Sequence, residues 1–388
     1  MNIAEKPEVM KQPSSVEFGY KSCSHIPRYL AESTRIFIVC DPALVHSAAK
    51  IGKSLASETE CTIYSHVEPE PKISTFEKIL LEAKTYRPDA VVGIGGGSTI
   101  DLAKLLAVLC NSDKSFSDIV GTDKIYEKRT IRLMAVPTTS GTGSEVSPIA
   151  ILTDSDQQLK IGAVSDELIP DVAVVDPELM LSMPPSVTAE TGMDAMTHCI
   201  EAYTNRFSTS KTDVVALEGI TLIGGNLLKA YRNGNDLAAR TAVARGALCG
   251  GLCLGSVNTA AVHALAYPLG GEFCVSHGKA NSMLLPYIME YNLSECVEKY
   301  ANIGKVLGCK EKNNQKRAQQ AIVMIRNLAQ ACGIPTGLKE LGVPQTALEH
   351  MATSALKVTR LILNNPRSLE YDDVLDIYSK AYCCTRGA

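Results

Sequence analysis

Short runs of apolar, largely β-branched residues alternate with helical stretches in the first half of the chain. Between Arg35 and about Met183 these runs lie at 35–42, 62–69, 89–97, 131–139 and 171–177. Nearly continuous apolar runs separated by helices are typical of strands that are buried on both faces of a parallel sheet. The pattern therefore predicts an α/β fold for this half.

The β-branched runs stop after Met183, where Pro184 and Pro185 follow. The rest of the chain shows helical periodicity over seven segments: 186–205, 211–232, 237–266, 294–308, 315–332, 345–357 and 371–383. Helix-rich sequence after an alternating region indicates a second, all-helical domain, with the proline pair as the boundary. We expect domains over residues 1–183 and 184–388.

Composition and charge narrow the function classes. The 388 residues are 45% hydrophobic and 21% charged, with a net charge of -4, as in globular proteins. No block of like charges could follow a phosphate backbone, so nucleic acid is not expected as a partner. The chain has no basic, apolar leader at its start and no run of about 18 uninterrupted apolar residues. We expect a cytoplasmic protein without a membrane anchor.

The chain contains 13 cysteines, scattered and often inside apolar runs. An odd, dispersed set is typical of free thiols in a reducing compartment rather than of a disulfide framework. Cys249 and Cys253 are four residues apart in a Gly-rich apolar segment, where buried packing is favoured over metal binding.

Two polar loops follow predicted strands. Gly95, Gly96, Gly97 and Ser98 end the run at 89–97 and lead directly into a helix. Such a turn lets a backbone approach a pyrophosphate, which the free N–H groups of the helix attract. The alternative is a tight turn in which Ser98 and Asp101 form a capping box.

The second loop, PTTSGTGSEVS at 137–147, offers hydroxyls and glycines where open α/β sheets place their ligands. Asp41 ends another predicted strand, where a carboxylate can accept hydrogen bonds from an adenosine ribose. It precedes Gly95 by 54 residues, unlike the acid of the usual dinucleotide fingerprint, which follows the glycines. Asp41 is therefore either a ribose ligand in a fold of another order or a turn former before Pro42.

Candidate metal ligands occur in the second half. In SVTAETGMDAMTHCIEAYTN (186–205), Asp194 and His198 lie one helical turn apart. An isolated Asp–His pair is more often a simple hydrogen bond. His263, however, occupies an apolar helix where an imidazole needs a partner, and His277 follows a break expected at Gly270–Gly271. One aspartate and three histidines suit Fe(II), Zn(II) or a similar ion with open coordination positions.

Several long motifs, in order, resemble the iron-containing, metal-dependent alcohol dehydrogenases. They are GGGSTIDLAK (95–104), PTTSGTGSEVS (137–147), DELIPDVAVVDPEL (166–179), MPPSVTAETGMDAMTHCIEAY (183–203), HALAYPLG (263–270), HGKAN (277–281) and NNPR (364–367). The resemblance implies a dinucleotide-binding α/β domain with a parallel sheet, then an all-α domain. Dehydroquinate synthase shares this two-domain architecture.

The resemblance also implies residue roles. Asp194, His198, His263 and His277 correspond to the family's metal ligands, with Fe(II) the usual ion and Zn(II) an alternative. The positions that correspond to cofactor contacts are Gly96, Gly97, Ser98, Thr138, Thr139, Thr142 and Lys160. Asp41 matches the acid of members that prefer NAD, since a carboxylate there would repel a 2′-phosphate. We expect NAD(H) as cofactor and hydride exchange with a small alcohol or aldehyde, whose oxygen the metal polarises.

Tyr267 is the main departure from the family pattern, which commonly has a second histidine at this position. Tyrosine can donate a hydrogen bond but, with an ordinary pKa near 10, is a poor proton acceptor at neutral pH. Tyr267 and Lys279 together favour a small aldehyde with an anionic sulfonate, phosphonate or carboxylate tail. Solvation alone would equally explain Lys279.

Two other function classes fit parts of the sequence. One is a related metal-dependent lyase or cyclase that uses NAD transiently, and the other is a non-catalytic NAD-binding protein. The HALAYPLG motif argues against the first and the intact set of four candidate ligands against the second. The resemblance further implies a homodimer or a larger homo-oligomer.

Overall fold

The structure is a computed structural model that describes residues 10–122, 124–125, 127–155 and 159–383. The chain forms two compact units. The first, here the sheet unit, comprises 12–183 together with 234–244. The second, the helical unit, comprises residues 10–11, 184–233 and 245–383 of the described chain.

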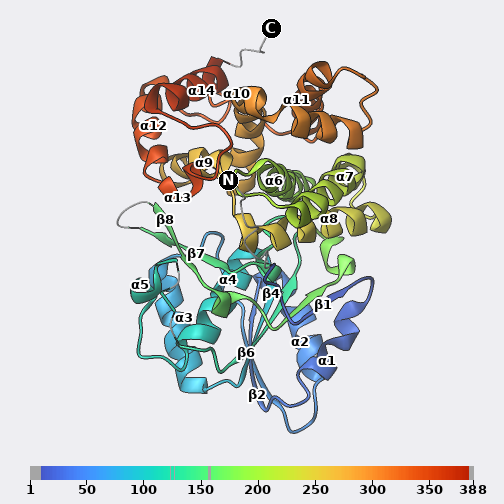
Figure 1. Cartoon of the computed structure of the whole chain (residues 1–388). Coiled ribbons are helices and arrows are strands. Elements are labelled where there is room, and N and C mark those ends of the chain that lie inside the picture. The colour runs from blue at the N-terminus through green and yellow to red at the C-terminus, as the bar shows by residue number, and fades with distance from the viewer. Residues whose placement is uncertain (1–9, 123, 126, 156–158, 384–388) are drawn as a thin grey trace, which may run out of the picture. The chain divides into compact units, whose positions relative to one another are not determined.

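The sheet unit is built on a six-stranded parallel sheet with the order β1-β9-β6-β4-β2-β3 (Figure 1). Its strands are β1 Ser15–Phe18, β2 Arg35–Cys40, β3 Glu60–Tyr64, β4 Ala90–Gly95, β6 Arg132–Pro137 and β9 Val172–Val175. Five of these strands fall in the predicted runs, and the parallel sheet is confirmed. β1 was not predicted, because it is short and lies at the edge of the sheet.

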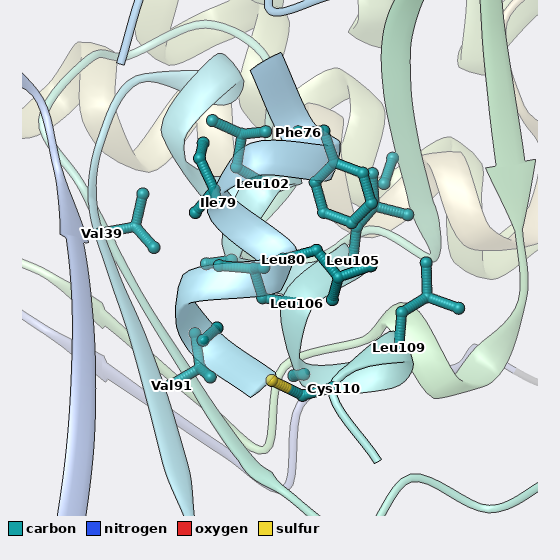
Figure 2. Close-up of a cluster of buried hydrophobic side chains, with 14 of the residues drawn as sticks. Val39, Phe76, Ile79, Leu80, Val91, Leu102, Leu105, Leu106, Leu109 and Cys110 are labelled. Atoms are coloured by element: carbon teal, nitrogen blue, oxygen red, sulfur yellow. The ribbon is translucent and has the colours of Figure 1, made fainter. Parts of the chain in front are cut away.

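Helices cover both faces of this sheet. The helices of the unit are α1 Ile26–Tyr29, α2 Val45–Lys53, α3 Ile73–Tyr86, α4 Gly97–Leu109 and α5 Phe116–Ile119. Successive β2 residues point to opposite faces, so Phe37 and Val39 pack in one buried cluster and Ile36 and Ile38 in another. Figure 2 shows the first cluster, in which α3 and α4 pack with Val39 and Val91.

A second, three-stranded sheet has the order β5-β8-β7. Its strands are β5 Gly121–Thr122, β7 Ile149–Asp154 and β8 Leu159–Val164, with β7 and β8 antiparallel. The sequence reading missed this sheet. β7 alternates buried and half-buried positions over only six residues, a pattern too short to separate from a loop.

The helical unit packs around α6 Pro185–Thr204, which contacts α7 Ser210–Arg232 and α10 His277–Val306. The other helices that lie wholly in this unit are α9 Ala261–Phe273, α11 Asn314–Ala331, α12 Leu348–Leu356, α13 Thr359–Ile362 and α14 Tyr371–Cys383. α8 Leu237–Val257 begins in the sheet unit and continues here. The α/β and all-α fold classes are confirmed.

Two predicted helix boundaries were wrong. The segment 237–266 is not one helix, because Asn258 adopts a left-handed conformation (φ 60°) between α8 and α9. Gly270 and Gly271 do not break the chain but lie inside α9, which ends at Cys274 (φ 54°). Tertiary packing outweighs the intrinsic helix cost of two glycines, about 1 kcal/mol each.

The segment 234–244 differs from the expected division at residues 183 and 184. Although it follows α7, it packs with the sheet unit. Arg240 is 1% exposed and donates hydrogen bonds of 3.0 Å to the carbonyl groups of Gly234 and Met183. A buried guanidinium satisfied by main-chain carbonyls holds this segment against the end of the sheet unit.

All cysteines in the described residues are free thiols, and Cys249 and Cys253 are buried as expected. By length and composition alone, α7 and α8 are apolar enough to cross a membrane. A buried core helix meets the same criterion, and 67% of the apolar window of α8 is buried. In α7, Ile220, Ile223 and Leu227 are buried within the helical unit.

The close contact between α4 and β4 depends on Gly93. A Cβ atom there would lie 2.8 Å from Ala103 Cβ and 3.3 Å from Ile100 Cα. Gly93→Ala is therefore expected to lower the free energy of unfolding by about 1–3 kcal/mol, because the helix must shift. Gly52→Ala in α2 is the control, since its Cβ would meet Cys61 Sγ at 3.4 Å, an ordinary contact. Denaturant unfolding followed by circular dichroism measures both, and equal stability of the two variants would contradict this reading.

Candidate functional site

The two polar loops of the sheet unit lie side by side. β4 and β6 are neighbours in register, with Gly95 opposite Pro137, so both loops leave the carboxyl edge of the sheet. The Thr138 N–H donates to the Gly95 carbonyl at 2.9 Å. A Cβ on Gly97 would lie 2.6 Å from Thr142 Cγ2, which only glycine permits. Gly96 is less crowded, since a Cβ there would lie 3.5 Å from Thr139 Cγ2, an ordinary contact.

The expected capping box at the start of α4 is wrong. The N-cap residue is Gly96, and no side chain caps the helix. Ser98 Oγ instead accepts a hydrogen bond from the Glu70 N–H at 3.2 Å. Asp101 accepts from Ser144 Oγ at 2.5 Å and from the Ile151 N–H at 3.0 Å, so it holds the second loop and β7. The first-turn amides of α4 therefore remain without a side-chain cap.

Asp41 lies at this same edge, because β2 pairs with β4 and ends one residue before it. Its Oδ1 accepts from the Ala43 N–H at 2.9 Å and caps the 3₁₀ helix Pro42–Leu44. The turn-forming role is therefore present. No hydrogen bond to the second carboxylate oxygen of Asp41 is found among the described residues.

Lys160, which the family resemblance places near the cofactor, lies in β8. Its Nζ forms an ion pair of 2.6 Å with Glu70, and only 11% of its side chain is exposed. The Glu70 N–H also donates to Ser98 Oγ. Glu70, which the sequence reading missed, thus joins Lys160 to the start of α4.

Two buried charged residues, Lys104 and Glu145, lie at the second loop. Lys104 Nζ donates hydrogen bonds of 2.8 Å to the carbonyl groups of Ser147 and Ile149. Burial lowers the pKa of Lys104 to about 8, against the opposing effect of Asp101 and Glu145. Burial also raises the pKa of Glu145 to about 7. These residues fix the loop backbone and face no solvent.

Three of the four candidate metal ligands come together in the helical unit. Asp194 on α6, His263 on α9 and His277 at the start of α10 place one ligand atom each within 4.8 Å of one another. Asp194 Oδ1 lies 3.7 Å from His263 Nε2 and 3.8 Å from His277 Nε2. His263 and His277 follow Asp194 by 69 and 83 positions in the sequence, so the fold brings distant residues together.

His198 lies beside this group but is not one of the three. Its ring stacks on that of His263, with centroids 4.8 Å apart and planes 19° from parallel. Its position one turn after Asp194 on α6 follows the predicted helix. Met193, Met196, Ile200 and Tyr203 on the same helix are buried.

Glu201 and Asn281 complete the surroundings of these ligands. The Glu201 carboxylate accepts from His263 Nδ1 and from the Val262 N–H, both at 2.6 Å. A carboxylate only accepts here, so the His263 proton is on Nδ1 and the Nε2 lone pair faces Asp194. Asn281 Nδ2 donates to Asp194 Oδ1 at 2.7 Å and lies 3.1 Å from His277 Nε2.

Sequence reasoning missed both supporting residues. It required a partner for His263, and Glu201, one turn after the i,i+4 pair Asp194 and His198 on α6, was the available signal. Asn281 is likewise one turn after His277 in HGKAN. Neither spacing alone distinguishes a partner from an ordinary buried polar residue.

The electrostatics of the cluster favour an ionised Asp194. Burial by itself would raise the pKa of this carboxyl group. The imidazoles of His198, His277 and His263 and the hydrogen bond from Asn281 outweigh it and lower the pKa to about 2. His263 Nε2 is buried and has no hydrogen-bond partner among the described residues. An unsatisfied lone pair beside a buried carboxylate fits a bound cation.

Tyr267 and Lys279 lie in the same unit. Tyr267 is half-buried on α9; burial raises the pKa of its hydroxyl, and the nearby Arg360 opposes this rise. Lys279 Nζ forms an ion pair of 3.2 Å with Glu190, which also accepts from Ser276 Oγ. The charge of Lys279 is therefore already compensated within the protein.

Comparisons with known proteins cover both halves of the chain. The family model described as "Iron-containing alcohol dehydrogenase" matches residues 13–177, and that described as "Fe-containing alcohol dehydrogenase family, C-terminal" matches 188–382. Long-chain-alcohol dehydrogenase 1 of Geobacillus thermodenitrificans is 38% identical over 358 residues, 90% of each chain.

Solved structures agree with this match. A 1,3-propanediol oxidoreductase superposes with a TM-score of 0.92 at 31% identity, covering 97% of this chain and 100% of the other. A sulfoacetaldehyde reductase of Bifidobacterium kashiwanohense, solved in complex with NAD+, superposes with a TM-score of 0.88 at 26% identity, covering 97% and 99%.

The matches define an oxidoreductase of the alcohol dehydrogenase class. The chain belongs to the iron-containing alcohol dehydrogenase family, so the resemblance inferred from its motifs is confirmed. Membership agrees with the expected cofactors, NAD and iron. It favours a dehydrogenase over the related lyase or cyclase and over a non-catalytic NAD-binding protein.

Proposed function

We propose that this protein interconverts a small aldehyde and its alcohol with NAD(H), using a divalent metal ion held by the helical unit. The observation that carries the proposal is the buried group of Asp194, His263 and His277, with ligand atoms within 4.8 Å of one another. The orphaned His263 Nε2 supports it, because burying an unpaired acceptor is costly unless a ligand satisfies it.

Four side chains would hold the ion: Asp194, His198, His263 and His277. This mixed oxygen and nitrogen donor set suits Fe(II), and it also accepts Zn(II). When bound, the ion supplies Lewis acidity toward the substrate oxygen, and NAD(H) supplies the hydride chemistry.

The chain's own residues prepare this site. Glu201 fixes the tautomer and orientation of His263, and its second hydrogen bond, to the Val262 N–H, ties it to the start of α9. Asn281 orients Asp194 through its amide. Such hydrogen bonds from outside the ligand set raise metal affinity by limiting the motion of the ligands.

In the sheet unit, the edge formed by Gly96, Gly97, Ser98 and Thr142 is proposed to hold the pyrophosphate. Its support is the uncapped start of α4, where free N–H groups attract an anion. Thr138 and Thr139 would contribute hydroxyls along the cofactor, and Lys160 would lie toward the nicotinamide. Asp41 would accept the ribose hydroxyls and disfavour a 2′-phosphate.

The substrate is proposed to be a small aldehyde with an anionic tail, reduced to its alcohol. The sulfoacetaldehyde reductase among the similar solved structures supports this class. Tyr267, a hydroxyl where the family commonly has a histidine, would face the substrate as a hydrogen-bond donor. We also propose a cytoplasmic homodimer or larger homo-oligomer, as the family resemblance implies.

Removal of the metal is expected to abolish NADH oxidation with an aldehyde, and Fe(II) is expected to restore it. The physical reason is that the ion supplies the Lewis acidity that stabilises charge on the substrate oxygen. Activity would be followed by NADH absorbance after exhaustive chelation and again after reloading under anaerobic conditions. Full activity in metal-free protein would refute the metal-dependent mechanism.

Glu201→Gln is expected to lower the affinity for Zn(II) by about 10–100-fold, because His263 and Val262 donate to different carboxylate oxygens and the amide replaces one of these by an NH2 donor. Calorimetric titration of metal-free protein measures the affinity, and near-ultraviolet circular dichroism checks the fold. Glu218→Gln, at an exposed pair with Arg245 on the helical unit, is the control. Unchanged affinity in Glu201→Gln would remove this residue from the site.

Asp41→Asn tests cofactor choice while keeping an oxygen to cap the Pro42–Leu44 helix. The ratio of kcat/KM for NADPH to that for NADH should rise about tenfold, equivalent to about 1.4 kcal/mol, because the repulsion of the 2′-phosphate is removed. Asp113→Asn, at an exposed position of the same unit, is the control. Equal use of both cofactors by the unchanged protein would already contradict the assignment.

A further inference from the structure

We propose that Arg360, together with the hydroxyl of Tyr267, binds the anionic tail of the substrate. The proposal rests on the proposed function, since it assumes that the aldehyde group lies at the cluster of Asp194, His263 and His277. The sequence analysis expected Lys279 to supply the positive charge for this tail. The structure points to Arg360 instead, a residue that the sequence did not indicate.

Tyr267 is placed to reach a substrate bound at that cluster. It follows His263 by four residues on α9, so the two side chains share one face of the helix, about 6 Å apart along its axis. Tyr267 is also close enough to Glu201, the partner of His263, to be affected by its charge. The tyrosine is half-buried and therefore partly accessible.

Arg360 is held beside Tyr267 by the packing of α13 on α9. Leu361 of the same short helix is fully buried and fixes its position. The guanidinium lies near the Tyr267 hydroxyl, and because it can only donate, it offers its N–H groups to an oxygen acceptor there. Burial raises the pKa of Tyr267, and the hydroxyl therefore keeps its proton at neutral pH. This O–H and the guanidinium N–H groups are donors available to a ligand.

The charge of Arg360 is not compensated within the described part of the chain. None of the ion pairs found there includes it, and its side chain is exposed. Lys279 pairs with Glu190 at 3.2 Å, and Lys299 with Asp213 at 3.2 Å. Of these three cations of the helical unit, only Arg360 keeps its charge for an external anion.

The donor groups of Arg360 and Tyr267 favour an anion with two or three oxygens. A guanidinium presents two parallel N–H groups that match two oxygens of a sulfonate or carboxylate, and the Tyr267 O–H adds a third donor. Because Tyr267 is only one helical turn from His263, the anion must be separated from the aldehyde carbon by one or two carbon atoms. We therefore expect short aldehydes such as sulfoacetaldehyde to be favoured over propanal.

The test compares kcat/KM for sulfoacetaldehyde and for propanal in the metal-loaded, full-length protein. Arg360→Gln should lower the value for sulfoacetaldehyde by about 10–100-fold, mainly through KM, and leave that for propanal within about twofold. Arg360→Lys should keep part of the preference, because it keeps the charge but not the paired N–H groups. Lys357→Gln removes a nearby exposed charge and should change neither value.

Loss of activity toward both aldehydes in Arg360→Gln, or a wild-type preference for propanal, would overturn the proposal. A second measurement separates it from the function of the metal site. Calorimetry with ethanesulfonate and NAD-loaded protein should show binding that Arg360→Gln abolishes, and equal binding by both would overturn it. If the wild type reduces no aldehyde at all, the proposed function fails, and the calorimetric comparison alone decides whether Arg360 is an anion site.

Discussion

His263 Nδ1 donates its proton to Glu201 in a buried part of the helical unit, and the candidate metal site depends on this hydrogen bond. It leaves the Nε2 lone pair directed toward Asp194, and no donor among the described residues satisfies it. A buried acceptor without a partner costs free energy, so the fold retains an arrangement that a cation would stabilise. α6 contributes both Asp194 and Glu201, and Glu201 bonds to Val262 and His263 near the start of α9.

In the sheet unit, the edge that carries the two polar loops depends on how closely the backbone of the first loop approaches side chains of the second. Gly97 leaves no room for a Cβ beside Thr142, and the Thr138 N–H bonds to the Gly95 carbonyl. These contacts make one edge from two loops that are about forty residues apart. The buried Lys104 then fixes the second loop by its main-chain carbonyls, so this edge is shaped before any ligand binds.

A cation that is already paired within the protein is not available to a substrate, whereas an unpaired cation is. Lys279 lies next to a candidate ligand turn, yet Glu190 neutralises it. Arg360 lies outside the family motifs, four residues before NNPR (364–367), and it is close to Tyr267, the position that departs from the family pattern. A change of one residue on α9 and one cation on α13 would then alter substrate choice without disturbing the metal ligands.

The sequence by itself determined the parallel sheet, the helical second half and the family, because these depend on local periodicity and on motifs of adjacent residues. It also indicated Asp194, His198, His263 and His277, whose residue types and spacing are chemically distinctive. Glu201, Asn281 and Arg360 became visible only in the tertiary structure. A carboxylate, an amide or an arginine is common at many positions, and its role depends on which distant side chain the fold brings within hydrogen-bonding distance. The pairing of Lys279 with Glu190 is decided in the same way, since it joins residues 89 positions apart.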